Sequence, residues 1–300
     1  MRLLNAVKDP YRLFLYLAGK GSFNRMNDKM YLRLKYRGKM GKKLHLSAPK
    51  TFNEKLQWLK LYDRKPEYTV MVDKYRVREY IREKIGGQYL IPLLGVWDSP
   101  QEIDFEALPE KFAMKCNHNS GLGMCICGDK SQLDIPKVRR DLMRGLQQDY
   151  YLTGREWPYK NVPRRVIAEH YLQSDEGGLT DYKIHCFNGI PRLILVCRDR
   201  FADSGLTDDF YTPKWEHLDL KRPGVPNAKE PIPKPEKLDE MLALASKLSD
   251  GIPFLRVDFY FVDGYIYFSE LTFFPASGFE AYDPPEWDEK LGDFLKLPVQ

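Results

Sequence analysis

The stretch FLRVDFYFVDGYIYFSELTFFP, residues 254–275, decides the fold class of this chain, because it has the pattern of a β-hairpin. Its two candidate strands, 254–261 and 265–273, are rich in Phe, Tyr, Val and Leu, which favour strands. The pair Asp263-Gly264 between them is a turn signal. We therefore predict an antiparallel hairpin over this stretch.

Two carboxylates, Asp258 and Glu270, lie inside these apolar strands, and the register of the hairpin decides whether they meet. A two-residue turn would pair Val262 with Tyr265 and place the carboxylates on opposite faces. A three-residue loop, with Gly264 in the left-handed conformation as a bulge, would place them on one face. We favour the odd loop, because it leaves the opposite face nearly all apolar.

The odd loop sorts the side chains of the hairpin into two faces. The polar face would hold Arg256, Asp258, Tyr260, Phe268, Glu270 and Thr272. The apolar face would hold Leu255, Val257, Phe259, Phe261, Tyr267, Ser269, Leu271 and Phe273. Two carboxylates on one face repel each other unless a cation lies between them. That cation could be magnesium, which needs only one or two protein carboxylates, or the arginine of a salt bridge, and the hairpin alone leaves both open.

The composition is that of a globular protein, since 300 residues with 43% hydrophobic side chains are enough for one large or two ordinary domains. There is no run of eighteen apolar residues, and the start, MRLLNAVKDP, lacks the features of a signal peptide. We therefore expect a cytoplasmic protein. Five cysteines without a paired CxxC spacing favour reduced core thiols over disulfides or a zinc site.

Positive charge is concentrated at the start of the chain, where residues 1–50 hold thirteen Lys or Arg against Asp9 and Asp28. This basic helical segment could lie on the inner face of an anionic membrane or bind an acidic polymer. A solvated helical face is the alternative. We find no motif for nucleic acid and expect no such partner.

Helical and strand patterns alternate along the rest of the chain. Helices are predicted over 52–62, 69–85, 137–149 and 236–248, and strands over 111–116, 124–127, 164–171, 181–188 and 191–198. Residues 201–235 are expected to form a connecting or substrate-covering segment. Strands that pair mainly as hairpins, with helices between them, predict an α+β fold.

The residues that could bind phosphate follow a fixed order. Lys74 is predicted on a helix, Lys115 at the end of a strand before the loop 119–123, and Glu169 at the end of another strand, and the acidic hairpin comes last. Two lysines can hold phosphate oxygens, and backbone N–H groups of the loop can close over them. This order indicates a site for a nucleotide and a metal ion.

In the order and spacing of these segments the chain resembles the ATP-grasp superfamily, and within it the TupA-like group linked to teichuronopeptide and capsular polysaccharide biosynthesis. The resemblance covers about residues 50–280 and rests on FNEKLQWLKLYDR, VDKYRVREYI, FAMKCNHNSG, VIAEHYL, TDYKIHCFNGIPRLILVCRDR and RVDFYFVDGYIYFSELT. It implies an ATP-grasp fold with two α+β subdomains that clamp a nucleotide. By this resemblance, residues 1–50 are a basic helical extension and residues 51–110 are a linker and partial substrate-side region. Residues 111–172 are the lid subdomain, and residues 173–300 are the catalytic subdomain.

The resemblance also implies the residues that bind ATP. Lys74 and Lys115 correspond to the two nucleotide lysines, and Ser120 and Gly121 to the small-residue loop. Three residues match the hinge that holds adenine, namely Glu169, Tyr171 and Leu172, and Asp181 resembles an acidic residue near the ribose.

Catalytic and metal-binding roles follow in the same way. Lys183 and Arg200 would lie near the reacting phosphate, and Arg256 resembles a transition-state cation. Asp258 and Glu270 look like the magnesium ligands, and Thr272 stands where the family commonly has Asn.

The expected activity is that of an ATP- and Mg²⁺-dependent carboxylate–amine ligase. The family context implies a uronic-acid saccharide and an amine or amino acid as substrates. A glycosyltransferase or an ATP-dependent kinase of polysaccharide biosynthesis is the alternative. The histidines His118, His170 and His185 have no partner fixed by spacing, which favours core or hydrogen-bonding roles over acid–base catalysis.

Overall fold

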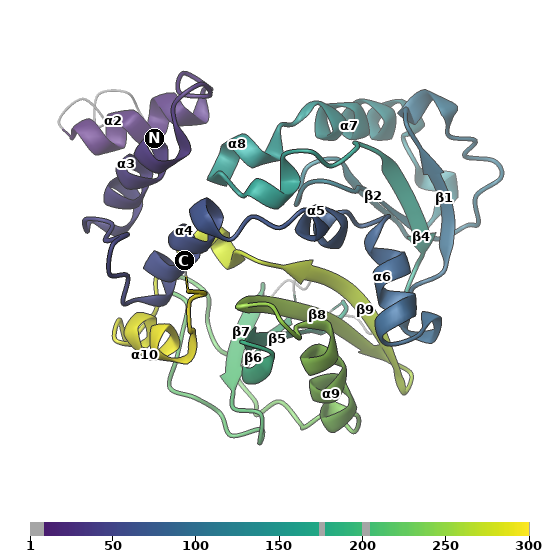
Figure 1. Ribbon diagram of the computed structural model, residues 1–300. Coiled ribbons are helices and arrows are strands. Elements are labelled where there is room, and N and C mark those ends of the chain that lie inside the picture. The colour runs from purple at the N-terminus through teal and green to yellow at the C-terminus, as the bar shows by residue number, and fades with distance from the viewer. Residues whose placement is uncertain (1–8, 174–177, 200–204, 300) are drawn as a thin grey trace.

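The computed structural model describes residues 9–173, 178–199 and 205–299, and in these ranges every pair of neighbouring strands is antiparallel. A four-stranded sheet has the order β1-β4-β2-β3, and a five-stranded sheet the order β7-β6-β5-β8-β9. The predicted α+β class is confirmed. Figure 1 shows the smaller sheet with α7 in the upper right and the larger sheet, with α9 beside it, below.

The bounds of the elements agree with most of the predicted ranges. The strands are β1 (Leu93–Trp97), β2 (Phe112–Cys116), β3 (Met124–Cys127), β4 (Val166–His170), β5 (Asp181–Phe187), β6 (Ile190–Arg198), β7 (Thr207–Tyr211), β8 (Phe254–Val262) and β9 (Tyr265–Thr272). The helices are α2 (Pro10–Gly19), α3 (Asp28–Met40), α4 (Phe52–Tyr62), α5 (Glu67–Val72), α6 (Val77–Lys84), α7 (Ile135–Gln147), α8 (Tyr150–Gly154), α9 (Leu238–Leu248) and α10 (Trp287–Phe294). The expected connecting segment 201–235 contains the edge strand β7.

The turn between β8 and β9 has two residues, so the predicted three-residue loop is wrong. Val262 pairs with Tyr265, and Asp263 and Gly264 between them have φ values of 50° and 77°. Two successive positive φ values are typical of the type I′ turn, whose twist matches that of the flanking strands.

The single extra residue that changes the register lies in a β-bulge at Ser269 of β9, and not in the turn. Phe259 pairs with Phe268, whereas Asp258 pairs with Glu270, so Ser269 has no partner of its own. The prediction that the two carboxylates share a face is confirmed, because they lie directly opposite each other.

The bulge also changes which aromatic side chains accompany the carboxylates. Tyr260 pairs with Tyr267, and Phe268 is buried opposite Phe259. Since paired residues point to the same face, Tyr267 shares the face of Asp258 and Phe268 lies on the apolar face, the reverse of the prediction.

The predicted helix 69–85 is two helices, α5 and α6, and Lys74 lies in the turn between them. Asp73 Oδ1 accepts from the backbone N–H groups of Tyr75 at 2.9 Å and Arg76 at 3.2 Å. Asn117 Nδ2 donates to the same oxygen at 2.8 Å. A side chain that binds nearby backbone competes with the helix, so the placement of Lys74 on a helix is wrong.

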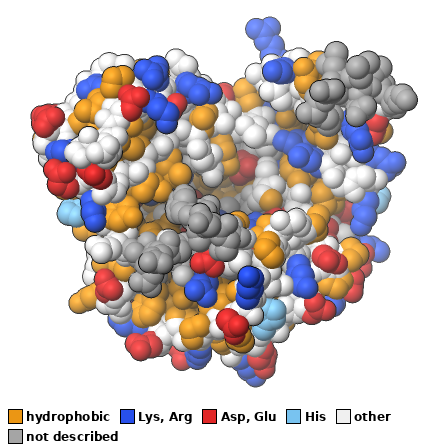
Figure 2. All heavy atoms as spheres, turned by 180° about the vertical axis from the view of Figure 1, so that it is seen from behind, with side chains coloured by type: hydrophobic (Ala, Val, Ile, Leu, Met, Phe, Trp, Pro, Cys, Tyr) orange, Lys and Arg blue, Asp and Glu red, His pale blue; other side chains and the backbone are white. Residues whose placement is uncertain are grey.

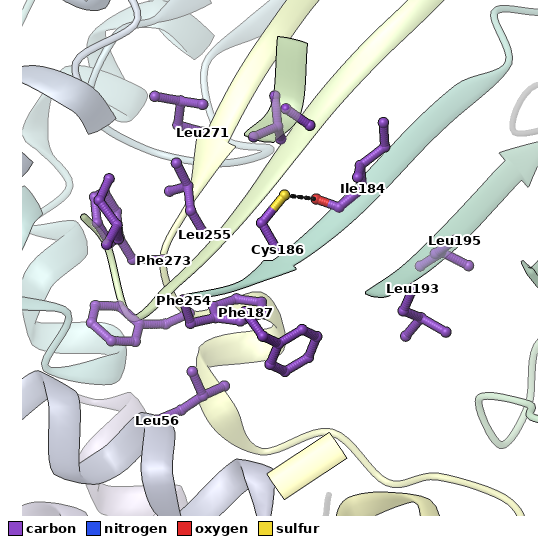
Figure 3. Packing of buried hydrophobic residues seen from close by; sticks show 14 of the residues in the cluster. Leu56, Ile184, Cys186, Phe187, Leu193, Leu195, Phe254, Leu255, Leu271 and Phe273 are labelled. Atoms are coloured by element: carbon purple, nitrogen blue, oxygen red, sulfur yellow. Dashed lines mark hydrogen bonds between the residues drawn. The ribbon is translucent and has the colours of Figure 1, made fainter. Parts of the chain in front are cut away.

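The main core lies around the five-stranded sheet and extends to α4. Phe52 of α4 packs against Phe187 and Phe254, with ring centroids 5.5 and 4.8 Å away. Figure 3 shows Leu56 of the same helix pointing toward this cluster. Helix α9 packs against β5, β6 and β8 through Met241 and neighbouring buried residues. A second, smaller core lies under the four-stranded sheet.

The N-terminal helices α2 and α3 pack beside α8 (Figure 1). They are separated by residues 20–27, and the left-handed Gly41 follows the end of α3. No helix in the described ranges is long and apolar enough to cross a membrane. All five cysteines are free thiols, and four of them lie in the core, with Cys125 half-buried.

Candidate active site

Asp258 is the most enclosed charge of the hairpin, with none of its surface exposed. Arg256 Nε donates to Oδ1 at 2.7 Å, and Arg256 Nη2 and Lys183 Nζ donate to Oδ2, each at 2.7 Å. Burial by itself would raise the pKa of Asp258, but the two cations hold it below its usual range. Asp258 is therefore ionised at neutral pH.

Glu270 and Thr272 share Arg256 with Asp258. Arg256 Nη2 donates to Glu270 Oε1 at 3.0 Å and to Thr272 Oγ1 at 3.1 Å, and Thr272 Oγ1 donates to Glu270 Oε1 at 3.2 Å. The Glu270 side chain is 33% exposed, so it forms the open side of the cluster. The arginine thus lies between the carboxylates, as in the salt bridge that the sequence left open.

The oxygen groups of this cluster fit magnesium by type. Two carboxylates and a hydroxyl lie on one sheet face, and magnesium prefers oxygen ligands and keeps water and phosphate oxygens in its shell. No three His, Cys, Asp or Glu residues are grouped to hold a metal anywhere in 9–173, 178–199 or 205–299. The protein would supply oxygen ligands from Asp258, Glu270 and Thr272. Glu270 is the more accessible of the two carboxylates.

Strand β5 brings two more predicted residues to this face. Lys183 pairs with Asp258 and Asp181 pairs with Tyr260 across β5 and β8. Lys183 Nζ also lies 3.4 Å from Asp181 Oδ2. Although burial opposes it, the Asp258 carboxylate raises the pKa of Lys183, so this lysine is a permanent cation.

His185, the next residue on this face, is neutral. It is buried, and its Nδ1 is 3.2 Å from the carbonyl oxygen of Lys183. Burial and the nearby Arg256 charge lower the pKa of His185 to about 3. The position of His185 fits the predicted core and hydrogen-bonding role.

Replacing His185 with Gln is expected to make the free energy of unfolding depend less on pH between pH 6.5 and 3. Between pH 6.5 and 3 the unfolded histidine binds a proton that the folded one does not, so stability is lost as the pH falls through this window. Urea titrations at pH 6.5 and 4.5 should show a loss smaller by about 2 kcal/mol in H185Q than in the parent chain. Equal losses would contradict the neutral assignment.

The four-stranded sheet carries a second ion-paired group. Lys115 Nζ lies 2.7 Å from Glu169 Oε2, and Arg78 Nη1 lies 3.0 Å from Glu169 Oε1. The Glu169 side chain is 8% exposed and that of Lys115 is 26% exposed. Sequence reasoning missed Arg78, although it stands four residues after Lys74 in the quoted VDKYRVREYI.

Lys74 is tied to the loop between β2 and β3. Its backbone N–H donates to Asn117 O at 3.1 Å, and its Nζ donates to Asn119 O at 2.7 Å. The turn between α5 and α6 is therefore held against the loop predicted to cover phosphates. Burial lowers the pKa of Lys74, and the Glu270 carboxylate opposes this shift.

The turn of Lys74 lies next to the larger sheet, because helix α5 ends two residues before it and packs against β9. Burial would lower the pKa of Lys115, but the Glu169 carboxylate holds it above its usual value, and Tyr260 and Glu270 act in the same direction. Figure 2 shows a hollow near the middle of one face of the molecule, bordered by hydrophobic side chains.

The remaining predicted residues lie in loops next to the four-stranded sheet or outside the described residues. Ser120 and Gly121 are exposed in the turn after β2, and Gly121 has a φ of 81°. Tyr171 and Leu172 follow β4 directly and are half-buried. Arg200 lies outside the described residues.

Helix α4 adds a polar stripe that sequence reasoning missed. Asn53, Gln57 and Lys60 are spaced four and three residues apart, so they share one helix face, and none of them is exposed. They bind the segment after β9: Asn53 Nδ2 donates to Glu280 O, and Gln57 and Lys60 donate to Ser277 O.

The segment held by this stripe is a left-handed turn. Ala276, Ser277 and Gly278 have φ values of 45°, 55° and 63°. A left-handed conformation costs about 1–2 kcal/mol for a residue with a side chain. The buried stripe of α4 offsets that cost and fixes the chain four residues beyond Thr272.

Asp208 and Asp209 form an acidic pair that binds other groups of the fold. Arg222 binds Asp208 Oδ2 through Nε at 2.7 Å, and Asp209 accepts from Ala228 N and contacts His217. Both carboxylates are buried. They are therefore not presented to a sugar nucleotide.

A model of the family described as TupA-like ATPgrasp matches residues 54–296. The chain belongs to the TupA-like ATP-grasp family. The predicted family and enzyme class are thereby confirmed, and the basic helices α2 and α3 lie before the matched range. No match was found among curated proteins.

Solved structures of ATP-dependent ligases are similar to this TupA-like chain. D-alanine-D-alanine ligase from Helicobacter pylori is 16% identical, with a TM-score of 0.45, over 81% of this chain and 69% of that protein. The ligase from Bacillus anthracis, complexed with ATP, is 17% identical, with a TM-score of 0.44, over 75% and 63%. The ATP-grasp ligase PsnB, solved with Mg and ADP, is 12% identical, with a TM-score of 0.42, over 85% and 64%.

Proposed function

We propose that this TupA-like protein is an ATP-dependent carboxylate–amine ligase that forms an amide through an acyl phosphate. The observation that carries the proposal is the cluster of Lys183, Arg256, Asp258 and Glu270 on one face of the large sheet, beside α5, the helix that leads into Lys74. Lysines on one side and acidic residues on the other would enclose a triphosphate and its cation.

The reaction needs ATP because a carboxylate is a poor electrophile. An oxygen of the substrate carboxylate would attack the γ-phosphorus of ATP, the bond to the β-phosphate oxygen would break, and ADP would leave. The amine would then attack the carbonyl carbon, lose a proton, and expel inorganic phosphate. Such transfers depend mainly on positioning and charge neutralisation.

The residues of the two sheets would have different roles in this reaction. Lys74 and Lys115 would hold phosphate oxygens, and Lys183 and Arg256 would offset charge that develops on the transferred phosphoryl group. Magnesium held by Asp258, Glu270 and Thr272 would supply further charge neutralisation. Because a buried Asp258 anchors both Lys183 and Arg256, it also orients the two cations.

The substrates follow from the family context and from charge. We propose a uronic-acid saccharide, or its precursor, as the carboxylate and an amino acid or other amine as the nucleophile. The thirteen basic residues among 1–50 are compatible with an acidic saccharide. An association of this segment with the inner membrane face remains part of the proposal.

The activity is tested by incubating the full chain with MgATP, uronic acids or oligouronates, and single amino acids. We expect ADP and phosphate in equal amounts, with an amide detected by mass spectrometry. Formation of ADP with a phosphorylated sugar and no free phosphate would identify a kinase. Protection against heat by a UDP-sugar and not by MgATP would favour a glycosyltransferase and overturn the ligase proposal.

A further inference from the structure

A cavity of about 850 Å³ lies between the N-terminal helices and the segment 147–153. Its charged and aromatic lining includes Arg12, Tyr16, Tyr31, Lys35, Lys39 and Asp149. The volume falls within the range of about 300–1,000 Å³ that is usual for small-molecule sites. None of these residues belongs to the phosphate site described above.

Positive charge in this cavity is not neutralised by its own lining. Arg12, Lys35 and Lys39 face one carboxylate, Asp149, and that carboxylate is 3.9 Å from Arg164. Arg12 lies 3.6 Å from Asp9, but both side chains are exposed, and such pairs bind weakly. Lys39 has no ion pair within the described part of the chain.

Lys35 lies close to other positive charges of the cavity. Lys35 and Lys39 are four residues apart on α3 and so share a face. Burial lowers the pKa of Lys35 to about 8, the Lys39 charge adds to the shift, and Glu156 opposes it. The Lys35 ammonium donates to the carbonyl oxygen of Thr153. An anion in the cavity would relieve the repulsion between these cations.

The cavity is linked to the elements of the predicted site through α8. Thr153 lines the cavity, and the neighbouring Gly154 O accepts from Lys60 at 2.8 Å. At the other end of α8, the ring of Tyr150 packs edge-on against that of Tyr159, and the segment 157–159 packs against α5, the helix before Lys74. Helix α8 thus lies between the cavity and the elements next to Lys74.

We propose that this cavity binds the non-reacting, carboxylate-bearing part of the acidic saccharide, with Arg12, Lys35 and Lys39 as its counter-charges. The proposal rests on the ligase function and names where its saccharide is held. A concave site lined by tyrosines and cations suits a chain of sugar acids, since the hydroxyl and ring of Tyr16 offer both polar and apolar contact. Figure 2 shows Lys and Arg side chains over the N-terminal helices.

The test is calorimetry with the full chain and tetragalacturonate, using its methyl ester as the uncharged control. The variant Arg12→Gln/Lys39→Gln removes two exposed cations without disturbing the Lys35 hydrogen bond, and Lys247→Gln on α9 is the matched control. We expect about tenfold weaker binding of tetragalacturonate by the double variant, no change in K247Q, no binding of the ester, and weaker binding at high salt.

Several results would overturn the proposal. These are equal affinities of the double variant and the parent, or no binding of tetragalacturonate by the parent. Binding of phosphatidylglycerol vesicles, lost in the double variant while the saccharide is not bound, would assign the cations to a membrane surface. MgATP binding is measured on the same samples, and its absence in the parent would count against the ligase function itself.

Discussion

Replacing Glu270 with Gln is expected to lower turnover with MgATP by about 10²–10³-fold while leaving the fold intact. The change removes one of two carboxylates that would hold magnesium, and it keeps the size of the side chain. The fold should survive because Glu270 is one-third exposed and Arg256 keeps its two bonds to Asp258. Turnover is measured as ADP release, and folding by circular dichroism and thermal melting.

The matched control for this variant is Glu79→Gln on α6. Glu79 is also paired with an arginine, since Arg82 Nη1 lies 2.9 Å from its carboxylate, but the side chain is 68% exposed and faces no lysine cluster. E79Q should keep full activity. If E270Q retains the parent's turnover and its magnesium dependence, the acidic pair is only a salt bridge and the metal assignment fails.

Asp258→Asn should be inactive as well, but it tests two properties at once. Asp258 is fully buried and holds Lys183 and Arg256, so its loss leaves two buried cations without their shared partner. Breaking a buried pair in this way costs about 3–5 kcal/mol. Glu270 is therefore the cleaner position at which to separate chemistry from stability.

Replacing Lys60 with Met is expected to lower the free energy of unfolding by about 3–5 kcal/mol. The lysine is not exposed, and its Nζ lies within 3.1 Å of four acceptors, on Gln57, Gly154 and Ser277. Burial lowers the pKa of Lys60 to about 7, against the effect of the Glu156 carboxylate. The variant would leave the strained turn 276–278 without this donor and would remove a positive charge that acts on the buried Glu156. Urea denaturation measures the loss.

Two further variants separate the loss of hydrogen bonds from the loss of the positive charge near Glu156. Lys55→Met on the same helix removes donors to Gly292 O and Leu295 O, with no buried carboxylate involved, and should cost only about 1–3 kcal/mol. Adding Glu156→Gln to K60M should recover part of the loss, because the uncompensated carboxylate is gone. A K60M variant as stable as K55M would show that the polar stripe of α4 does not hold the turn.

The local sequence pattern was enough to predict the strands that carry the candidate active site. The alternation of apolar residues and the Asp-Gly turn signal predict the hairpin of 254–275, and the paired strands 181–188 and 191–198 are found within one or two residues of their predicted bounds. The shared face of Asp258 and Glu270 was also predictable, because only an odd residue in the hairpin leaves the opposite face nearly all apolar. The order of lysines, glutamate and acidic hairpin pointed to the family that the chain belongs to.

Tertiary structure alone decided how these elements work together. The sequence does not show that the odd residue is Ser269, because a bulge and a longer loop give the same parity. Nor does it show that Lys60 is buried: a lysine on an amphipathic helix normally reaches solvent, and here it meets Ser277, 217 residues further along the chain. Local periodicity carries no information on such distant contacts, and it is these that also hold Lys74 against the loop after β2.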